Sequence, residues 1–185
     1  DKEGVFSKNI EMQEPTLYSL ALGNEYIIIC PTIGEQISIK ASGSNFSGTY
    51  NIEGSLESEL LKELNKENYN VRLSLKSMSE ELSKADTAKL DSIRTSIIEK
   101  YTSTKQYQEK ITSDFINKNL GSLTTLIALY RTFDGFALFD YNQSLEMHKK
   151  VLQGLKQTLP NNQHTLTLEN FIAEKENAQK ENGTK

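Results

Sequence analysis

The single cysteine is the residue of this chain with the clearest chemical potential. Cys30 has no second cysteine to pair with, so it cannot form an intrachain disulfide bond or a CxxC redox pair. It ends the apolar run Tyr26–Cys30, and no lysine, arginine or histidine lies within eight residues on either side. Reactive thiols need an electropositive, open setting. We therefore predict that Cys30 is a small, inert core residue.

The two histidines and the paired carboxylates lack the partners that chemistry would need. His148 and His164 lie in no HExxH motif, and a zinc site needs three or four converging ligands. We expect both histidines at the surface. The pairs Glu57/Glu59 and Glu80-Glu81 lie among serine and lysine, so we interpret them as surface charge rather than as an acid–base pair. The sequence therefore predicts no catalytic, cofactor-binding or metal-ligating residue and no cofactor, and it identifies no ligand-binding residue.

Composition narrows the classes of function. Of 185 residues, 36% are apolar, and 21 basic residues stand against 25 acidic ones, a formal net charge of −4. That balance argues against a nucleic-acid partner, which would favour a basic patch. The longest apolar run has strand length and falls far short of the roughly 18 residues of a membrane helix. The first residues do not resemble a signal peptide, but a processed chain would look the same.

Several short patterns match glycosylation sites. Three fit the N-glycosylation triplet, and we interpret them as chance matches: Asn45-Phe46-Ser47, Asn142-Gln143-Ser144 and Asn182-Gly183-Thr184. Asp86-Thr87-Ala88 and Asp91-Ser92-Ile93 resemble the acceptor of some envelope O-glycosylation systems. Whether either of these two is modified stays open at this point.

Residues 1–54 are expected to form a small antiparallel sheet of about five strands. Phe6 to Met12 alternates in polarity, and Gly23-Asn24 between two apolar runs is a hairpin signal. Pro31 should end the second strand of that hairpin. Two more short strands follow, and the connections between strands are too short for parallel crossovers.

Residues 55–119 are expected to form a long antiparallel helical hairpin. Gly54-Ser55 changes the apolar period from two to three or four, and Ser55 suits an N-cap. Two seams follow, joined by a turn at Lys84-Ala85 with Asp86 as the next cap. The first seam is Leu61, Leu64, Asn68, Val71, Leu75, Met78 and Leu82, and the second is Leu90, Ile93, Ile97, Tyr101, Thr104, Tyr107, Ile111 and Phe115. We prefer pairing within one chain to dimerisation, and we expect Asn68 to meet a polar group such as Thr104.

Residues 120–172 are expected to form a compact C-terminal helical bundle that makes one domain with the β region. Ser122 should cap an apolar helix that runs to Phe133, where Asp134-Gly135 breaks it. Amphipathic segments follow from Asn142 to Leu159 and from Leu166. Apolar residues almost disappear over 173–185, which predicts a linker. The predicted fold class is therefore α+β.

The order of these motifs resembles a known family. It is the domain of unknown function that precedes the thioredoxin-like domain in envelope thiol-disulfide oxidoreductases of the TlpA/ResA type in Gram-negative bacteria. The similar segments are Gly4-Val5-Phe6, Glu14-Pro15-Thr16-Leu17-Tyr18, the stretch Thr32 to Ile39, Tyr50 to Ser55, Phe115 to Asn119 with Ser122-Leu123, and Leu152 to Pro160. They span nearly the whole chain. Leu120 stands where the family usually has proline, and family members begin with further strands that would lie upstream of Asp1.

The resemblance implies an accessory role without catalysis. The chain would position a thioredoxin-like domain that follows 173–185, mediate its dimerisation or bind a partner for it. Its expected location is the periplasm or outer envelope, and a lipid anchor upstream of Asp1 is left open. The expected partners are that redox domain and either a further protein or a second copy of the chain. No nucleic-acid partner is expected. The alternative is a free-standing carbohydrate- or peptide-binding module that uses the sheet face and its tyrosine and phenylalanine side chains.

Overall fold

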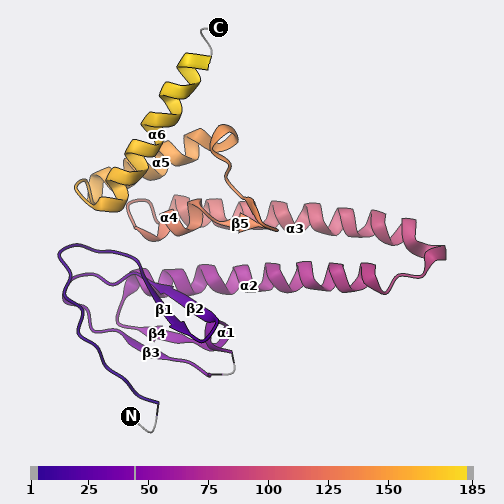
Figure 1. The fold of residues 1–185 in the computed structure, drawn as a ribbon, viewed down its shortest axis with the longest axis horizontal. Coiled ribbons are helices and arrows are strands. Elements are labelled where there is room, and N and C mark those ends of the chain that lie inside the picture. The colour runs from indigo at the N-terminus through magenta and orange to yellow at the C-terminus, as the bar shows by residue number, and fades with distance from the viewer. Residues whose placement is uncertain (1–3, 44, 183–185) are drawn as a thin grey trace.

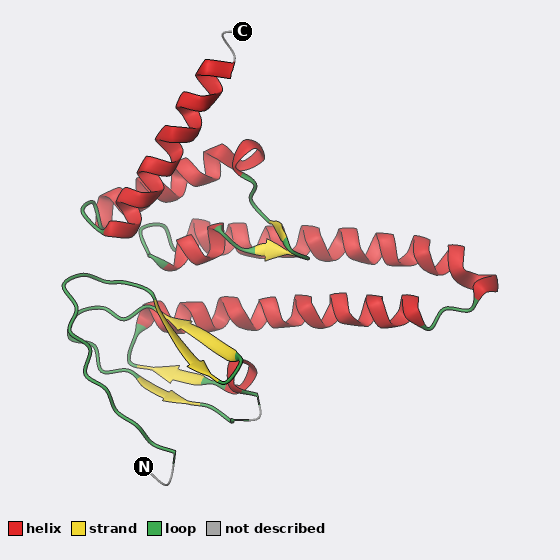
Figure 2. Cartoon of the chain, viewed as in Figure 1, coloured by secondary structure: helices red, strands yellow, loops and turns green. Residues whose placement is uncertain are grey.

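The structure is a computed structural model that describes residues 4–43 and 45–182, with the side chains of the last two of these excepted. It is a mixed α+β fold, as predicted, in which helices dominate (Figures 1 and 2). The elements are β1 Tyr18–Leu22, β2 Glu25–Ile29, β3 Ser38–Lys40, α1 Phe46–Thr49, β4 Asn51–Glu53, α2 Leu56–Ser83, the 3₁₀ turn η1 Thr87–Lys89, α3 Leu90–Lys118, α4 Thr124–Leu129, β5 Thr132–Phe133, β6 Phe136–Ala137, α5 Tyr141–Thr158 and α6 Gln163–Asn182.

The β region does not form one sheet of about five strands, and that expectation was wrong. It forms two separate antiparallel hairpins, β1–β2 and β3–β4. The turn at Gly23-Asn24 is confirmed, because Leu22 pairs with Glu25 across it. Phe6 to Met12 forms no strand, and its side chains are mostly exposed.

The two hairpins pack face against face because strand β2 has two apolar faces. Ile27 and Ile29 point to one side and join a small core with Phe46, Tyr50 and Ile52. Ile28 and Cys30 point to the other side and join the main core under the helices. Since side chains alternate along a strand, β2 ties the β region to the helical part.

The switch from strand to helix occurs at Gly54-Ser55, as predicted. The Ser55 side chain accepts a hydrogen bond from the Ser58 backbone N–H at 3.3 Å and caps α2. Gly54 has φ +91°, and a Cβ at this position would lie 2.2 Å from the Gln36 carbonyl oxygen. Only glycine fits there without a shift of the backbone.

Helices α2 and α3 form the long hairpin within a single chain, and its far end projects beyond the β region and α4 (Figure 1). Lys84 and Ala85 form the turn, and the Asp86 side chain accepts from the Ala88 N–H, so it caps η1 rather than α3 itself. Lys100 and Glu81 pair across the two helices at 2.7 Å. The apolar faces of the two helices therefore pack against each other within the part of the chain that the structure describes.

The seam residues of α2 are confirmed along most of its length, whereas part of the α3 seam was wrong. Leu61, Leu64, Val71 and Met78 are buried, Leu75 is partly buried and Leu82 is exposed. On α3 the most buried side chains are instead Gln108, Thr112 and Ile116, while Tyr107 is half exposed. Each buried residue lies one position after a predicted one, because α3 contacts both α2 and α4 and therefore buries a wider arc.

Asn68, the polar residue of the α2 seam, meets a polar partner as expected, although the partner is not Thr104. The Gln108 side-chain N–H donates to Asn68 Oδ1 at 2.7 Å. A polar pair at a seam position costs stability but fixes the register of two helices. Tyr107 also spans the hairpin, since its hydroxyl donates to Glu67 at 3.1 Å.

The C-terminal part differs from expectation in two places. Helix α4 ends at Leu129 rather than Phe133, and the chain then forms the small hairpin β5–β6 around Asp134 and Gly135, both at positive φ. Such an Asp-Gly pair suits a tight primed turn. Residues 173–182, predicted as a linker, continue α6 as helix, and 183–185 lie outside the described residues.

We predict that truncation of Leu64 destabilises the chain far more than truncation of Leu73. Leu64 is buried between α2 and its neighbours, whereas Leu73 on the same helix is about half exposed. Leu64→Ala should cost about 2–4 kcal/mol, and Leu73→Ala less than about 0.5 kcal/mol. Chemical unfolding followed by circular dichroism measures both, and equal losses would contradict the packing described here.

Candidate functional site

Cys30 is a buried core residue, as predicted. Its backbone N–H donates to the Ser58 hydroxyl at 3.0 Å, and its carbonyl accepts from the Ser55 hydroxyl at 3.3 Å. The side chain is fully buried beside Leu61 and Ile116 in the main core. Burial, with smaller contributions from the charges of Glu57 and Glu35, raises the pKa of the thiol to about 12.

His148 is not at the surface, which corrects the sequence prediction. It is almost fully buried, and its Nδ1 lies 3.0 Å from the Ser144 carbonyl oxygen. Its ring packs edge-on against Tyr141 and Tyr130, and Phe171 lies beside it. The signal in the sequence was its place among Leu145, Val151 and Leu152 on the apolar side of α5.

His164 is half-buried and takes part in a clamp between the two ends of the fold. Its Nε2 lies 3.0 Å from the Thr16 hydroxyl. Asn162 caps α6 by accepting from the His164 N–H at 2.9 Å, and its side-chain N–H donates to the Pro15 carbonyl at 2.8 Å. This clamp holds the segment before β1 against the start of α6. Among the described residues, no group of three or more His, Cys, Asp or Glu side chains could hold a metal ion.

The clamp borders an apolar groove of about 310 Å³. Its lining comes from the residue before β1, from β2, from α4 and the residue after it, and from the first turns of α6. It consists of Leu17, Ile28, Leu126, Ile127, Tyr130, His164, Thr167 and Leu168. An apolar hollow with a few polar groups is the usual form of a site for a small molecule or a side chain. The volume of this groove lies at the lower end of the usual range.

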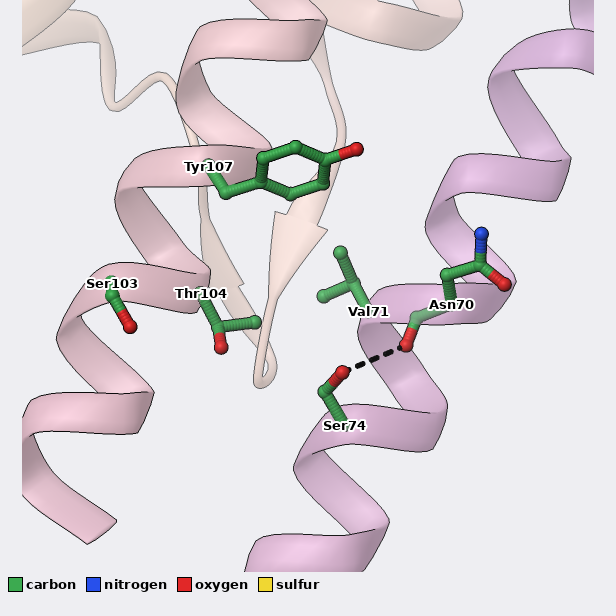
Figure 3. Close-up of a pocket in the computed structure, with 6 residues that line it drawn as sticks. All are labelled: Asn70, Val71, Ser74, Ser103, Thr104 and Tyr107. Carbon is green, nitrogen blue, oxygen red and sulfur yellow. Dashed lines mark hydrogen bonds between the residues drawn. The ribbon is translucent and has the colours of Figure 1, made fainter. Parts of the chain in front are cut away.

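A second, polar groove of about 250 Å³ lies between α2 and α3. Small side chains leave this space, and Figure 3 shows Val71 and Thr104 pointing toward each other beneath the ring of Tyr107. The Ser74 hydroxyl donates to the Asn70 carbonyl of its own helix at 3.1 Å (Figure 3). Because such a hydroxyl group is bonded to the backbone of its own helix, this groove is a weaker candidate for a binding site than the apolar groove.

The third candidate is a buried arginine that the sequence analysis missed. Arg131 follows α4, is only 7% exposed, and donates from Nη2 to Asn65 Oδ1 at 3.1 Å. Its Nε and Nη1 are buried without a hydrogen-bond partner. Burial, then the charge of Arg72, lower the pKa of Arg131 to about 10, so the guanidinium is still charged at neutral pH.

Three of the four carboxylates in the acidic pairs are exposed, those of Glu59, Glu80 and Glu81, and the modification patterns are only partly placed. Glu57 is half-buried and hydrogen-bonded to the Ser122 hydroxyl, whereas Glu81 forms the exposed pair with Lys100. Asp86-Thr87-Ala88 lies at the exposed tip of the hairpin. Its glycosylation, and that of Asp91-Ser92-Ile93, stays a prediction. The triplet that begins at Asn182 falls partly outside the described residues.

Comparisons with protein-family models, with curated proteins and with solved structures found no match to this chain. No helix within residues 4–43 and 45–182 has the combined length and apolarity that crossing a membrane requires.

We predict that Cys30 reacts slowly in the folded chain. A pKa raised from the ordinary value of about 8.5 to about 12 leaves roughly 2,000-fold less thiolate at pH 8. The burial contribution to stability is full below about pH 8.5 and falls as pH rises toward 12, since only the unfolded state ionises in that range. Labelling with a chromogenic disulfide in buffer and in denaturant measures the difference, with Cys30→Ser as the blank. Equal rates would contradict the burial.

We predict that the Asn162 clamp stabilises the fold measurably. Asn162→Ala removes both the cap of α6 and the bond to Pro15, and should cost about 1–3 kcal/mol. Asn161 is exposed, so Asn161→Ala is the matched control and should change the free energy of unfolding by less than about 0.5 kcal/mol. If both variants unfold alike, the clamp does not join the two ends.

Proposed function

We propose that this chain is a non-catalytic accessory domain of a periplasmic thioredoxin-like thiol-disulfide oxidoreductase, which it serves by positioning the redox domain or by binding its partner. The motif resemblance motivates the proposal. Its physical support is the form of α6, which begins at the Asn162 clamp and runs without a break to Asn182. The proposal assigns the thiol chemistry to a domain that would follow this chain.

The anchoring of α6 is what makes it suited to positioning. Its first turns are buried through Thr165, Leu168 and Ile172, and Phe171 packs edge-on against Tyr141. Farther along, Glu176 pairs with Lys149 of α5 at 2.8 Å. The helix then points away from the body (Figure 1). A helix held firmly at one end would give a following domain a fixed direction, whereas a flexible linker would not.

The proposal is tested on the full parent protein by breaking α6. The sequence that follows Lys185 in the parent is expected to contain a CxxC motif. Glu174→Pro removes one helical hydrogen bond and kinks the exposed part of α6, and Glu174→Ala keeps the helix. The proline variant should reduce disulfides of a protein substrate several-fold more slowly while its rate on a small disulfide is unchanged. No CxxC motif, or equal rates for both variants, would refute the proposal.

A second function, a peptide-binding module, is favoured by the apolar groove. The lining offers Tyr130 and Thr167 at its edge and Ile127 inside, a setting that suits one apolar side chain of a peptide. Thr167 is exposed, so Thr167→Trp should fill the groove without loss of stability. If the groove is the site, this variant loses binding to peptides with an exposed leucine or phenylalanine, whereas Thr102→Trp on α3 keeps it. Binding unaffected by Thr167→Trp would exclude this function.

A further inference from the structure

Arg131 is held rigidly at a junction of three parts of the fold. Its backbone N–H donates to the Ala128 carbonyl at 3.3 Å, and its own carbonyl accepts from the Leu138 N–H at 2.8 Å. The side chain reaches Asn65 on α2. The main chain of Arg131 is therefore fixed on both sides, and its guanidinium is bonded to α2.

The neighbours of Arg131 supply donors but no acid. Asn65 accepts from Arg131 and donates from its amide to the Tyr50 hydroxyl at 3.3 Å, so both ends of the amide are engaged. The Tyr50 hydroxyl acts as the acceptor in this contact and keeps its own hydrogen for donation. Like Nε and Nη1 of Arg131, the hydrogen of the Tyr50 hydroxyl therefore has no acceptor among the described residues.

The charge around this cluster is also uncompensated. Neither Arg131 nor Arg72 forms an ion pair within 4.0 Å with any carboxylate in the described part of the chain. Arg72 is exposed on α2, two turns after Asn65, and lies 5.7 Å from the centre of the Tyr69 ring. Its charge acts on Arg131 strongly enough to lower the pKa of that group. A buried cation without an acid destabilises the fold, so natural proteins rarely leave one unpaired.

We propose that Arg131, Tyr50 and Arg72 form a binding site for one carboxylate group. A guanidinium matches the two oxygens of a carboxylate with a parallel pair of donors, here the second hydrogen of Nη2 together with Nε or Nη1 beside it, and the Tyr50 hydroxyl adds a third donor. Arg72 stands at the exposed side, where it attracts the anion. The free nitrogens lie beneath the surface, so the occupant is a small acid or the carboxylate terminus of a peptide. This site is independent of the proposed accessory role.

A single carboxylate fits better than a phosphate. One buried cation neutralises one charge, and a doubly charged anion would bring a second charge below the surface with only the solvated Arg72 to balance it. The site would therefore prefer acetate to inorganic phosphate at equal concentration.

The site is tested by titrating the whole chain with sodium acetate against sodium chloride at equal ionic strength. Thermal unfolding and the arginine side-chain NMR signals are followed together. We expect acetate to raise the unfolding temperature in a saturable way and to shift the Arg131 Nε signal, with phosphate weaker. N-acetylglycylglycine and its amide form a second arm: no binding of the amide, with the acid bound more tightly than acetate, would identify a peptide terminus as the source of the carboxylate, whereas equal binding of the acid and acetate would identify a small acid.

Variants separate this site from a general salt effect. Tyr50→Phe removes one hydroxyl, and Arg72→Gln removes only an exposed charge, so both should fold and should bind several-fold more weakly. Arg131→Met should not bind. Arg94→Gln is the matched control, because Arg94 is an exposed arginine paired with Asp91 near the hairpin tip, and it should bind as the unchanged chain does. Equal responses to acetate, chloride and both glycine compounds would overturn the proposal, as would unchanged binding by Tyr50→Phe and Arg72→Gln.

Discussion

Helix α2 has to bury two faces at once, and the rest of the fold is arranged around that constraint. On one side it contacts β2 and β4, and on the other α3 and α4. Leu61 and Leu64 of α2 share the main core with Cys30 of the β region and Ile116 of α3. Neither the short hairpins nor α3 could be independently stable, because two-stranded pairs and isolated helices are marginal in water. The β region and the helical end are therefore joined by α2, and the Asn162 clamp adds a second contact between them.

Polar contacts on α2 then fix what apolar burial leaves unspecified. Hydrophobic burial is non-directional, so it brings α3 onto α2 without setting how far one helix slides along the other. The Gln108–Asn68 bond sets that register inside the seam. Asn65, three residues earlier, links Tyr50 of the β region to Arg131 after α4. The same two asparagines thus hold the hairpin in register and place the donor-rich cluster where an anion could enter it.

Local signals in the sequence predicted the helices and hairpins. The predictions failed where contacts between distant residues determine the structure. Ser55 as a cap and the Gly23-Asn24 turn depend on neighbouring residues, so they could be identified. The α3 seam could not, because its buried arc is set by α4, which packs against it from elsewhere in the chain. Arg131 was missed for the same reason: an isolated arginine is usually exposed, and only the folded chain places Asn65 and Tyr50 beside it. For β5–β6, by contrast, Asp134-Gly135 was a usable hairpin signal that we took only as a helix breaker.

The central claim is that α2 and α3 pair with each other in a register set by Asn68 and Gln108. A double-mutant cycle on the free energy of unfolding tests it most directly, using Asn68→Leu, Gln108→Leu and the double variant. Each single change leaves a buried amide without its partner, whereas the double change removes both groups together. The account predicts that the double variant loses at least about 1 kcal/mol less than the two single losses added together. Losses that add within about 0.5 kcal/mol would contradict it, since residues that do not interact behave in that way.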